Sequence, residues 1–482
     1  MRWVALVGAL STSLAQPPQG TAAPGGSAAV GPNDSGDLLA PTSLNGNFAP
    51  DIVATGDSTV PTSIQLAPGQ QDNANEGVYL DFSNIQQPQP LRASGGGTKP
   101  TGSPDTSALD RENSDVFAPP GTDAGSVPNA VWPLGLSHNR AGLNGAGWAR
   151  QQNTDVLPAA KDMAGVDMRL SPYSYRELHW HSTGEWAYIL VGSVRVSVVN
   201  SNGQSYIDDL QAGDVWFFPS GIPHSIQALD EGVEFLLIFD DGSFSEDDTA
   251  LASELFMRNP KSVLAKNFKT DIDAFNDIPM EQLYIFTGTN PGNISSQNLT
   301  GPSGYNLDPQ SQYTFHWSQQ DALEVPDAGS VKILDTRSFP SASDFAVALI
   351  TVKPGAMREL HWHIDSDEWN FFIKGQARIT IFSAPSSSRT YDYHEGDVGY
   401  IPIADAHYIE NTGDEDLVVL EVLQAPQFTD ISVAQWLGLT PKQVVKETLN
   451  LPDEVIDNLP KYKPILIPGH TNLTNTNYTG KF

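Results

Sequence analysis

Two copies of one histidine-containing segment constrain this chain more than any other feature. Arg176-Glu-Leu-His-Trp-His181 recurs as Arg358-Glu-Leu-His-Trp-His363. In both halves a glutamate follows within a few residues, and a later histidine follows, His224 in the first half and His407 in the second. Six of the ten histidines belong to these two sets. The pattern predicts two copies of one domain, each with one metal site.

The two sets supply the same ligand types. The candidate metal ligands are His179, His181, Glu185 and His224 in the first half and His361, His363, Glu368 and His407 in the second. Alternate residues of a strand point to one face, so each His-Trp-His triplet can aim both histidines into a barrel interior. Three neutral imidazoles and one carboxylate leave two positions of an octahedron open for water, dioxygen or a chelating substrate.

A single His-X-His sequence would favour two histidines with a structural role. Recurrence of the whole four-residue set favours metal binding instead. The ligand types do not identify the metal, because copper or zinc would compete for the same atoms.

Length and charge limit the partners of the protein. A chain of 482 residues is long enough for two to three domains. The net charge of −31 repels nucleic acid and anionic lipid headgroups, so neither is an expected partner. An anionic substrate would need positive charge from a metal or from arginines. The chain has no cysteine, which excludes disulfides, thiolate metal sites and cysteine nucleophiles.

The N-terminal residues have the pattern of a secretory signal. A short basic start, the apolar run Val4–Leu10 and small residues at Ser13 and Ala15 predict a signal peptide over residues 1–15. The apolar run is too short to span a membrane. We therefore expect a secreted, extracellular glycoprotein. Five Asn-X-Ser/Thr sequons fit this expectation: Asn33, Asn293, Asn298, Asn472 and Asn477.

Composition divides the remaining chain. Residues 16–75 are rich in Pro, Gly, Ser, Ala and Asn and predict a disordered or propeptide-like arm. Residues 76–130 predict an extended N-terminal arm. From about Val131, short runs of β-branched and aromatic residues are separated by Gly, Pro, Asn and Asp, as is typical of antiparallel sandwiches or barrels. The predicted strands are Trp186–Val191, Val194–Val199, Val215–Phe218, Val233–Phe239, Trp369–Ile373, Ala377–Phe382, Val398–Ile401 and Leu417–Leu423.

The duplication continues beyond the strands. Pro260–Pro279 matches Pro441–Pro460 in length and apolar spacing, and both segments predict short helices that follow the β-domain. The expected units are a first β-domain with its helical appendage over 131–285, a second over 286–465, and a C-terminal tail over 466–482.

These residues carry a resemblance to the cupin superfamily, whose first motif reads G-x5-H-x-H-x3-4-E-x6-G and whose second reads G-x5-P-x-G-x2-H-x3-N. Beside the metal ligands, the matching positions are Gly355, Gly375, Gly396, Pro402 and Asn411 in the second half and Gly192, Gly213, Pro219 and Gly221 in the first. Departures from the motifs are Tyr173, Ala228 and Ala404, and none of them removes a ligand. The resemblance implies an all-β fold of two tandem cupin (jelly-roll β-barrel) domains with short helical appendages.

The extended match, over about Val131 to Lys463, resembles microbial and fungal oxalate decarboxylases, which are bicupins. It implies manganese in each half, dioxygen as a co-catalyst, oxalate as the substrate, formate and carbon dioxide as products, and a trimer or hexamer. Oxalate is a small dianion that suits two open positions on a hard cation. After carbon dioxide leaves, the one-carbon remainder needs a proton from a positioned acid.

The resemblance assigns the acids and the substrate-binding arginines. In the first half Glu246 would be the proton donor on a mobile lid, with Gly242 as a flexible joint. In the second half the corresponding acid would be Glu421. Without the resemblance, Glu246 reads as an exposed loop carboxylate and Glu421 as a carboxylate satisfied inside the barrel.

Arg176 and Arg358 would hold and polarise the substrate, since a guanidinium suits a carboxylate. Strict strand alternation instead places Glu177 on the histidine face, so a bulge or strand start must reorient the arginine.

Three other functions remain open from the sequence. A bicupin oxalate oxidase would produce hydrogen peroxide and two molecules of carbon dioxide. A dioxygenase acting on a larger aromatic substrate would need a wide apolar mouth. A storage or cell-wall cupin would be a non-enzyme, but such proteins have generally lost the ligands that this chain retains.

Overall fold

The computed structural model describes residues 121–279, 283–297, 299 and 312–469. The whole chain divides into two units, residues 1–56 and 57–482, and every described residue belongs to the second. The predicted signal peptide, the arm over 16–75, the arm residues before 121 and the sequons at Asn33, Asn298, Asn472 and Asn477 lie outside the described residues. In the described part of the chain, no helix combines the length and the apolar character that crossing a membrane requires.

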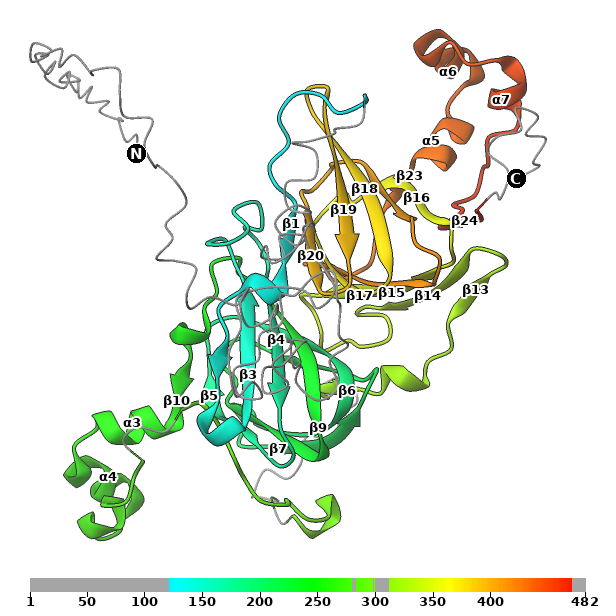
Figure 1. Ribbon diagram of the computed structural model, residues 1–482. Helices are drawn as coiled ribbons and strands as arrows, with labels where there is room; N and C mark the ends of the chain where they lie inside the picture. Colours follow the sequence, from blue (N-terminus) through cyan, green and yellow to red (C-terminus); the bar gives the residue numbers. More distant parts are fainter. Residues whose placement is uncertain (1–120, 280–282, 298, 300–311, 470–482) are drawn as a thin grey trace, which may run out of the picture. The chain divides into compact units, whose positions relative to one another are not determined.

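Each half forms an antiparallel jelly-roll β-barrel (Figure 1). The strands of the first half are β2 (Arg140–Ala141), β3 (Gly147–Gln152), β4 (Ala164–Leu170), β5 (Tyr175–Trp180), β6 (Glu185–Val199), β7 (Ser205–Gln211), β8 (Val215–Phe218), β9 (His224–Phe239), β10 (Ala250–Leu251) and β11 (Ile285–Phe286). Those of the second are β13 (Leu323–Val325), β14 (Gly329–Leu334), β15 (Ala346–Val352), β16 (Met357–Trp362), β17 (Glu368–Lys374), β18 (Gln376–Ser383), β19 (Ser387–His394), β20 (Asp397–Ile401), β21 (His407–Asn411), β22 (Leu417–Leu423), β23 (Ile431–Ser432) and β24 (Leu466–Ile467).

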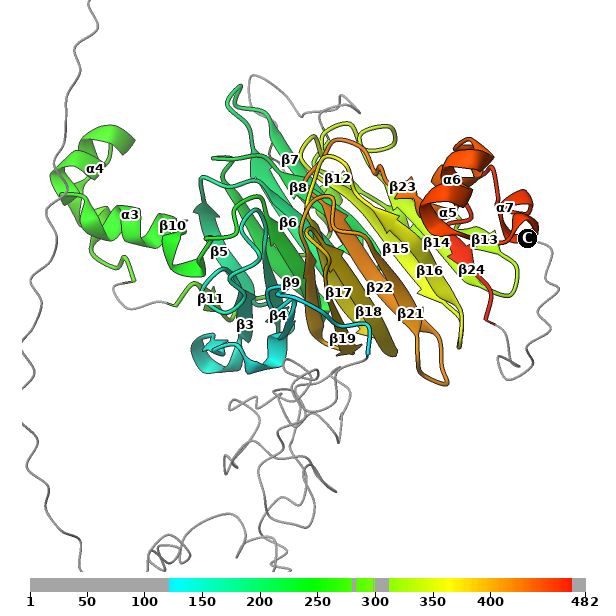
Figure 2. The same cartoon turned by 90° about the horizontal axis from the view of Figure 1, so that it is seen from above.

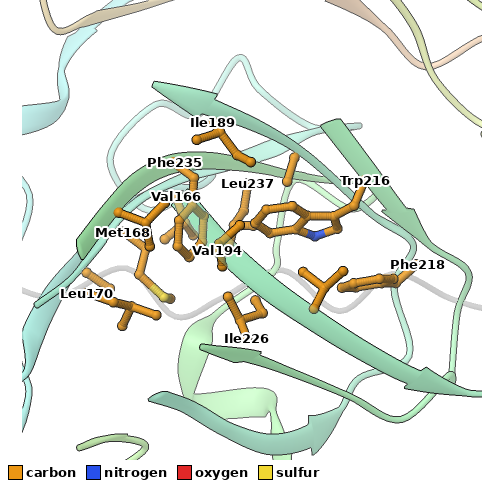
Figure 3. Close-up of a cluster of buried hydrophobic side chains, with 14 of the residues drawn as sticks. Val166, Met168, Leu170, Ile189, Val194, Trp216, Phe218, Ile226, Phe235 and Leu237 are labelled. Carbon is orange, nitrogen blue, oxygen red and sulfur yellow. The ribbon is translucent and has the colours of Figure 1, made fainter. Parts of the chain in front are cut away.

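The core of the first barrel follows the period of two that strands impose. Val166, Met168 and Leu170 alternate along β4 and are fully buried in one cluster with Trp216 and Phe235 (Figure 3). Full burial of an aliphatic side chain of this size contributes roughly 1.5–3 kcal/mol. The cluster holds the strands that carry the histidines in a rigid frame.

A second core joins the two barrels. Leu236 and Ile238, which alternate with core residues of β9, pack in one cluster with Trp369 and Val422 of the second half. The part of β9 over residues 233–239 is therefore buried on both faces, which explains its nearly continuous apolar run.

Each half also contributes a short strand to the other. β1 (Val131–Pro133) pairs with β20 of the second barrel, and β12 (Thr314–Phe315) pairs with β8 of the first. The arm residues before β1 continue along the second barrel, where Tyr391 Oη donates to the carbonyl oxygen of Pro128 at 2.6 Å. Each barrel is thus completed by a short strand from the other sequence repeat.

The helical appendages recur in both halves (Figures 1 and 2). The helices are α3 (Ala252–Arg258), α4 (Lys261–Phe268) and the 3-10 turn η6 (Ile272–Phe275) after the first barrel, and α5 (Val433–Leu439), α6 (Lys442–Leu449) and α7 (Asp453–Asp457) after the second. Helices α4 and α6 both end at a residue in the left-handed conformation, Lys269 and Asn450. After each appendage a short strand returns to the histidine-bearing strand, β11 to β5 and β24 to β16. The predicted boundary at residue 465 falls directly before β24.

One strand is longer than expected, and two motif glycine positions keep a glycine-like backbone without glycine. Trp186–Val191 and Val194–Val199 were expected as separate strands, but they form the single strand β6, in which register shifts at Gly192 absorb the turn. Tyr173 and Ala404, which replace motif glycines, keep the left-handed backbone with φ of 63° and 65°. Holding a residue with a Cβ in that region costs roughly 1–2 kcal/mol, which the surrounding barrel offsets.

Candidate metal centres and active site

The first predicted ligand set converges inside the first barrel. His179 lies on β5, His181 directly follows that strand, Glu185 begins β6 and His224 begins β9. One ligand atom from each residue lies within 4.8 Å of the others, and all four side chains are buried. The turn 181–185 and the pairing of His179 with His224 across β5 and β9 bring the set together.

The second set converges in the same way in the second barrel. His361 lies on β16, His363 directly follows it, Glu368 begins β17 and His407 begins β21. Their ligand atoms also lie within 4.8 Å of one another, and His361 pairs with His407 as His179 pairs with His224. The structure therefore brings together each of the two predicted sets.

Backbone carbonyls determine which nitrogen of each ring faces the centre of the site. In the first half, His179 Nδ1 donates to the carbonyl oxygen of Glu177 at 2.6 Å, and His224 Nδ1 donates to that of Ile222 at 2.8 Å. His181 Nδ1 donates to the carbonyl oxygen of Thr183 at 2.8 Å. A carbonyl only accepts, so Nδ1 carries the proton and the Nε2 lone pair points inward.

The second half repeats this arrangement. His361, His363 and His407 each donate through Nδ1 to a backbone carbonyl, at 2.7, 2.7 and 3.0 Å. All six imidazoles thus present the atom that binds a metal.

The inward-facing atoms fit a cation. Glu185 Oε2 lies 3.0 Å from His181 Nε2, and Glu368 Oε2 lies 2.6 Å from His363 Nε2 and 3.0 Å from His407 Nε2. The Nε2 atoms of His224, His361 and His363 have no hydrogen-bond partner although they are buried. Lone pairs so close together repel one another unless a positive charge lies between them, so three imidazoles and a carboxylate suit a divalent ion.

Electrostatics support a neutral His179 and an ionised Glu185. Burial and the neighbouring Arg176 hold the pKa of His179 well below its usual value. Burial alone would raise the pKa of Glu185, but His224 and His181 outweigh it and hold that pKa well below the usual value. Trp216 Nε1 donates to Glu185 Oε1 at 2.8 Å, which orients the carboxylate. Neutral imidazole and ionised carboxylate are the forms that bind a metal.

A bulge turns the arginine towards the site. The register of β5 against β9 shifts between Arg176 and His179, and that of β16 against β21 shifts between Arg358 and His361. Both arginines are about 1 % exposed. The expectation that a bulge must reorient Arg176 is confirmed, because strict alternation would have separated it from the histidines.

The predicted acid of the first half lies beside this arginine. Glu246 belongs to the segment 240–249, which we call the lid, and its Oε2 lies 3.2 Å from Arg176 Nη2. Phe244 of the lid packs against the ring of His181. Burial raises the pKa of Glu246, and Arg176 only partly offsets the effect. The lid thus places a buried carboxyl that favours its acid form next to a buried guanidinium.

The second site has a different set of charges. Glu421 is fully buried on β22, with Oε1 at 3.7 Å from Arg358 Nε. Burial, and then the negative charge of Glu368, raise the pKa of Glu421 to about 7. Arg358 also forms a hydrogen-bonded ion pair with Asp430, which in turn pairs with Lys463. This arginine is therefore bound on two sides by carboxylates.

Asp430 and Lys463 were missed by the sequence analysis. One signal could have identified Asp430: it follows Phe428 by two residues, as Glu246 follows Phe244, and Phe428 packs against His363 as Phe244 packs against His181. No spacing could have identified Lys463, because it lies in the segment that returns after the second appendage.

Comparisons with known proteins agree with this architecture. The cupin family model matches residues 136–274 and 305–457. The oxalate decarboxylase of Bacillus subtilis is 43% identical over 376 residues, which cover 78% of this chain and 96% of the relative. A structure of that enzyme, from work on its Mn(II) centres, has a TM-score of 0.72 at 42% identity and covers 80% of this chain and all (100%) of its own.

A structure of the Lactobacillus farciminis oxalate decarboxylase in complex with formate has a TM-score of 0.68 at 44% identity, with 71% of this chain and 100% of that chain covered. Family model, sequence relatives and solved structures all span both barrels. The chain belongs to the cupin family, and within it is an enzyme of the bicupin oxalate decarboxylase family.

Proposed function

We propose that this enzyme converts oxalate to formate and carbon dioxide, with manganese in both barrels and dioxygen as a co-catalyst. The reaction takes hydrogen oxalate to formate and carbon dioxide, so one carbon–carbon bond breaks and one carbon–hydrogen bond forms. The proposal is supported by the two sets of three imidazoles and one carboxylate and by the relatives, which are oxalate decarboxylases.

The residues of the first barrel suit each requirement of this reaction. His179, His181, Glu185 and His224 would hold the ion. When bound, such an ion supplies a cationic anchor for a chelating dicarboxylate and an exchangeable electron. Arg176 offers a buried guanidinium to a carboxylate of the substrate, and its charge compensates that of the anionic substrate in a strongly acidic protein.

The observation that carries the proposal is the position of Glu246. Its carboxyl is buried and lies 3.2 Å from Arg176, and burial raises its pKa, so it holds a proton up to a higher pH than an exposed glutamate does. A retained proton is what separates decarboxylation from oxidation, since the one-carbon remainder must be protonated before it loses a further electron. The lid also excludes water, because Phe239 and Phe244 stack at 3.5 Å over the histidine side of the site.

The decisive experiment measures formate, hydrogen peroxide and metal on one purified sample incubated with oxalate at mildly acid pH. We expect one formate for each oxalate consumed, little peroxide, and up to two manganese ions per chain. Peroxide in proportion to oxalate consumed would instead identify an oxalate oxidase. Failure to consume oxalate with both sites filled would refute both activities.

We also propose that the protein is secreted and glycosylated. In support, the N-terminal residues have a signal pattern, and Asn293, the sequon asparagine among the described residues, is exposed. Expression of the full chain in a eukaryotic host should place it in the medium with a mass that falls after glycosidase treatment. Retention inside the cell would refute secretion.

A homo-oligomer, a trimer or a hexamer, is the third part of the proposal. Both helical appendages expose large apolar side chains, which a second copy of the chain could cover. They are Leu255, Val263, Phe268, Ile272, Trp436, Leu439, Val444, Leu449 and Val455. Light scattering coupled to size-exclusion chromatography should give a mass above that of one chain. The double variant Leu439→Glu/Val444→Glu should reduce that mass.

A further inference from the structure

Two polar side chains hold the lid of the first barrel from outside the site. Arg140 on β2 donates through Nη1 to Gln151 Oε1 at 2.8 Å and through Nη2 to Asp247 Oδ2 at 2.7 Å. Gln151 on β3 accepts, at the same oxygen, a hydrogen bond of 3.1 Å from the backbone nitrogen of Glu246. The two contacts to the lid therefore fall on consecutive residues.

These contacts fix the position of the carboxyl that the reaction would use. The bond from Gln151 reaches the backbone of Glu246 itself, whereas its carboxyl contacts Arg176 at 3.2 Å. The ion pair of Arg140 with Asp247 adds a contact at the next residue. Glu246 is thereby held both by its main chain and by its side chain.

The second barrel shows that this arrangement is not a general requirement of the fold. Gly147 pairs with Leu170 as Gly329 pairs with Val352, which aligns β3 with β14 residue by residue. In that register Gln151 corresponds to Ile333, and Arg140, opposite Ala149, corresponds to Leu323, opposite Val331. Both positions are apolar in the half whose acid, Glu421, lies on a strand.

Both halves share a simpler anchor, one hydrogen bond to the backbone of a phenylalanine. Asn153 Nδ2 donates to the carbonyl of Phe244 at 3.0 Å, and Asp335 Oδ2, at the corresponding position, accepts from the backbone nitrogen of Phe428 at 3.2 Å. This anchor holds the phenylalanine that covers a histidine ligand. The contacts of Arg140 and Gln151 are added to it only where the acid is carried by a loop.

We propose that Arg140 and Gln151 form a latch that holds the lid closed and sets the position of Glu246, so that they are positioning residues that determine the ratio of decarboxylation to oxidation. The proposal rests on the proposed function of Glu246. When the latch opens, the carboxyl leaves Arg176 and the one-carbon remainder loses its proton source. Both electrons of the broken carbon–carbon bond then pass to dioxygen, so hydrogen oxalate, dioxygen and one proton from solvent give two molecules of carbon dioxide and one of hydrogen peroxide in place of formate.

The residues of the second barrel supply the test variants. Arg140→Leu and Gln151→Ile place in the first barrel the side chains that the second tolerates at the same register, which limits the risk of misfolding. Leu323→Ala, on the exposed strand β13 of the second half, is the matched control. Gln151→Glu keeps an acceptor for both donors and serves as the conservative variant.

The first readout is independent of turnover. Amide hydrogen exchange of a peptide covering residues 243–249 should be about two- to tenfold faster in Gln151→Ile, because one hydrogen bond contributes roughly 0.5–1.5 kcal/mol. Arg140→Leu should accelerate exchange less, about two- to threefold, since its partner Asp247 is exposed and the pair is screened by water. The Gln151→Glu variant and the Leu323→Ala control should exchange like the parent protein.

The second readout is the product ratio at full manganese occupancy. The double variant Arg140→Leu/Gln151→Ile should release about tenfold more peroxide per formate than the parent protein. The single variant Gln151→Glu should keep the parent ratio. Unchanged lid exchange and an unchanged product ratio in the double variant would overturn the latch. If the parent protein makes no formate, the proposed function fails separately, and the exchange data still decide whether the latch holds the lid.

Discussion

Glu246 and Asp430 occupy equivalent positions in the two barrels, two residues after the phenylalanine that covers a histidine ligand, yet only Asp430 also pairs with a lysine. Each contacts the arginine of its own site. Glu246 lies on a loop between two strands, whereas Asp430 lies between Arg358 and Lys463. Duplicated sequences have thus produced one site whose loop carboxyl contacts the arginine alone and one whose carboxylate belongs to an ion-pair network.

Replacement of Glu246 by glutamine should remove formate production and spare the metal. The amide cannot deliver the proton, so we expect formate formation to fall by about 10²- to 10⁴-fold. Elemental analysis should give the same manganese content as the parent protein. Glu254→Gln, on the exposed surface of α3, is the control and should retain activity. Unchanged formate output from Glu246→Gln would remove this residue from the mechanism.

The effects of Asp430 and Lys463 on the free energy of unfolding should depend on each other. Asp430→Asn leaves Arg358 and Lys463 facing each other in a buried place and should lower the free energy of unfolding by about 3 kcal/mol. Addition of Lys463→Met should recover part of the loss. Urea unfolding of the four proteins of this double-mutant cycle measures the coupling. Strictly additive losses would show that the network does not act as a unit.

The contribution of Glu421 to the stability of the metal-free protein should fall as the pH rises. Its pKa is raised from 4.5 to about 7 by burial and Glu368, so this group binds more protons in the folded than in the unfolded state between these values. The contribution is full below pH 4.5 and is lost up to about pH 7, by about 3 kcal/mol in total. The stability of Glu421→Gln relative to the parent protein should therefore rise between pH 4.5 and pH 7, as measured by unfolding of both proteins at the two pH values. The same difference between the two proteins at both pH values would contradict the assignment.

Removal of one ligand should empty one site only. His224→Ala and His407→Ala should each lower the manganese content by one ion per chain, because the two ligand sets share no residue. Chelation of both ions should lower the melting temperature, and readdition of manganese should restore it, with an increase that follows the logarithm of the manganese concentration. Loss of both ions from either single variant would show that the sites depend on each other.

The candidate ligands and the all-β duplication could be predicted from the sequence because they depend on local spacing. His179 and His181 share a strand end, Glu185 begins the next strand after a tight turn, and nearly the same offsets recur 182 residues later at His363. Period-two strands and punctuating turns translate directly into barrel geometry. Arg176 lies in the same local segment, three residues before His179, although a bulge decides where its side chain points.

The tertiary structure decided the contacts between residues that are distant in the chain. Arg140 meets Asp247 across 107 positions, Asp430 meets Arg358 across 72, and β1 and β12 join the barrel of the opposite half. Such pairings depend on which surfaces pack once the barrels have closed, and no periodicity records them. The sequence by itself therefore determined where two metals can bind, whereas the packing of distant segments decided which site carries an acid on a loop held by Arg140 and Gln151.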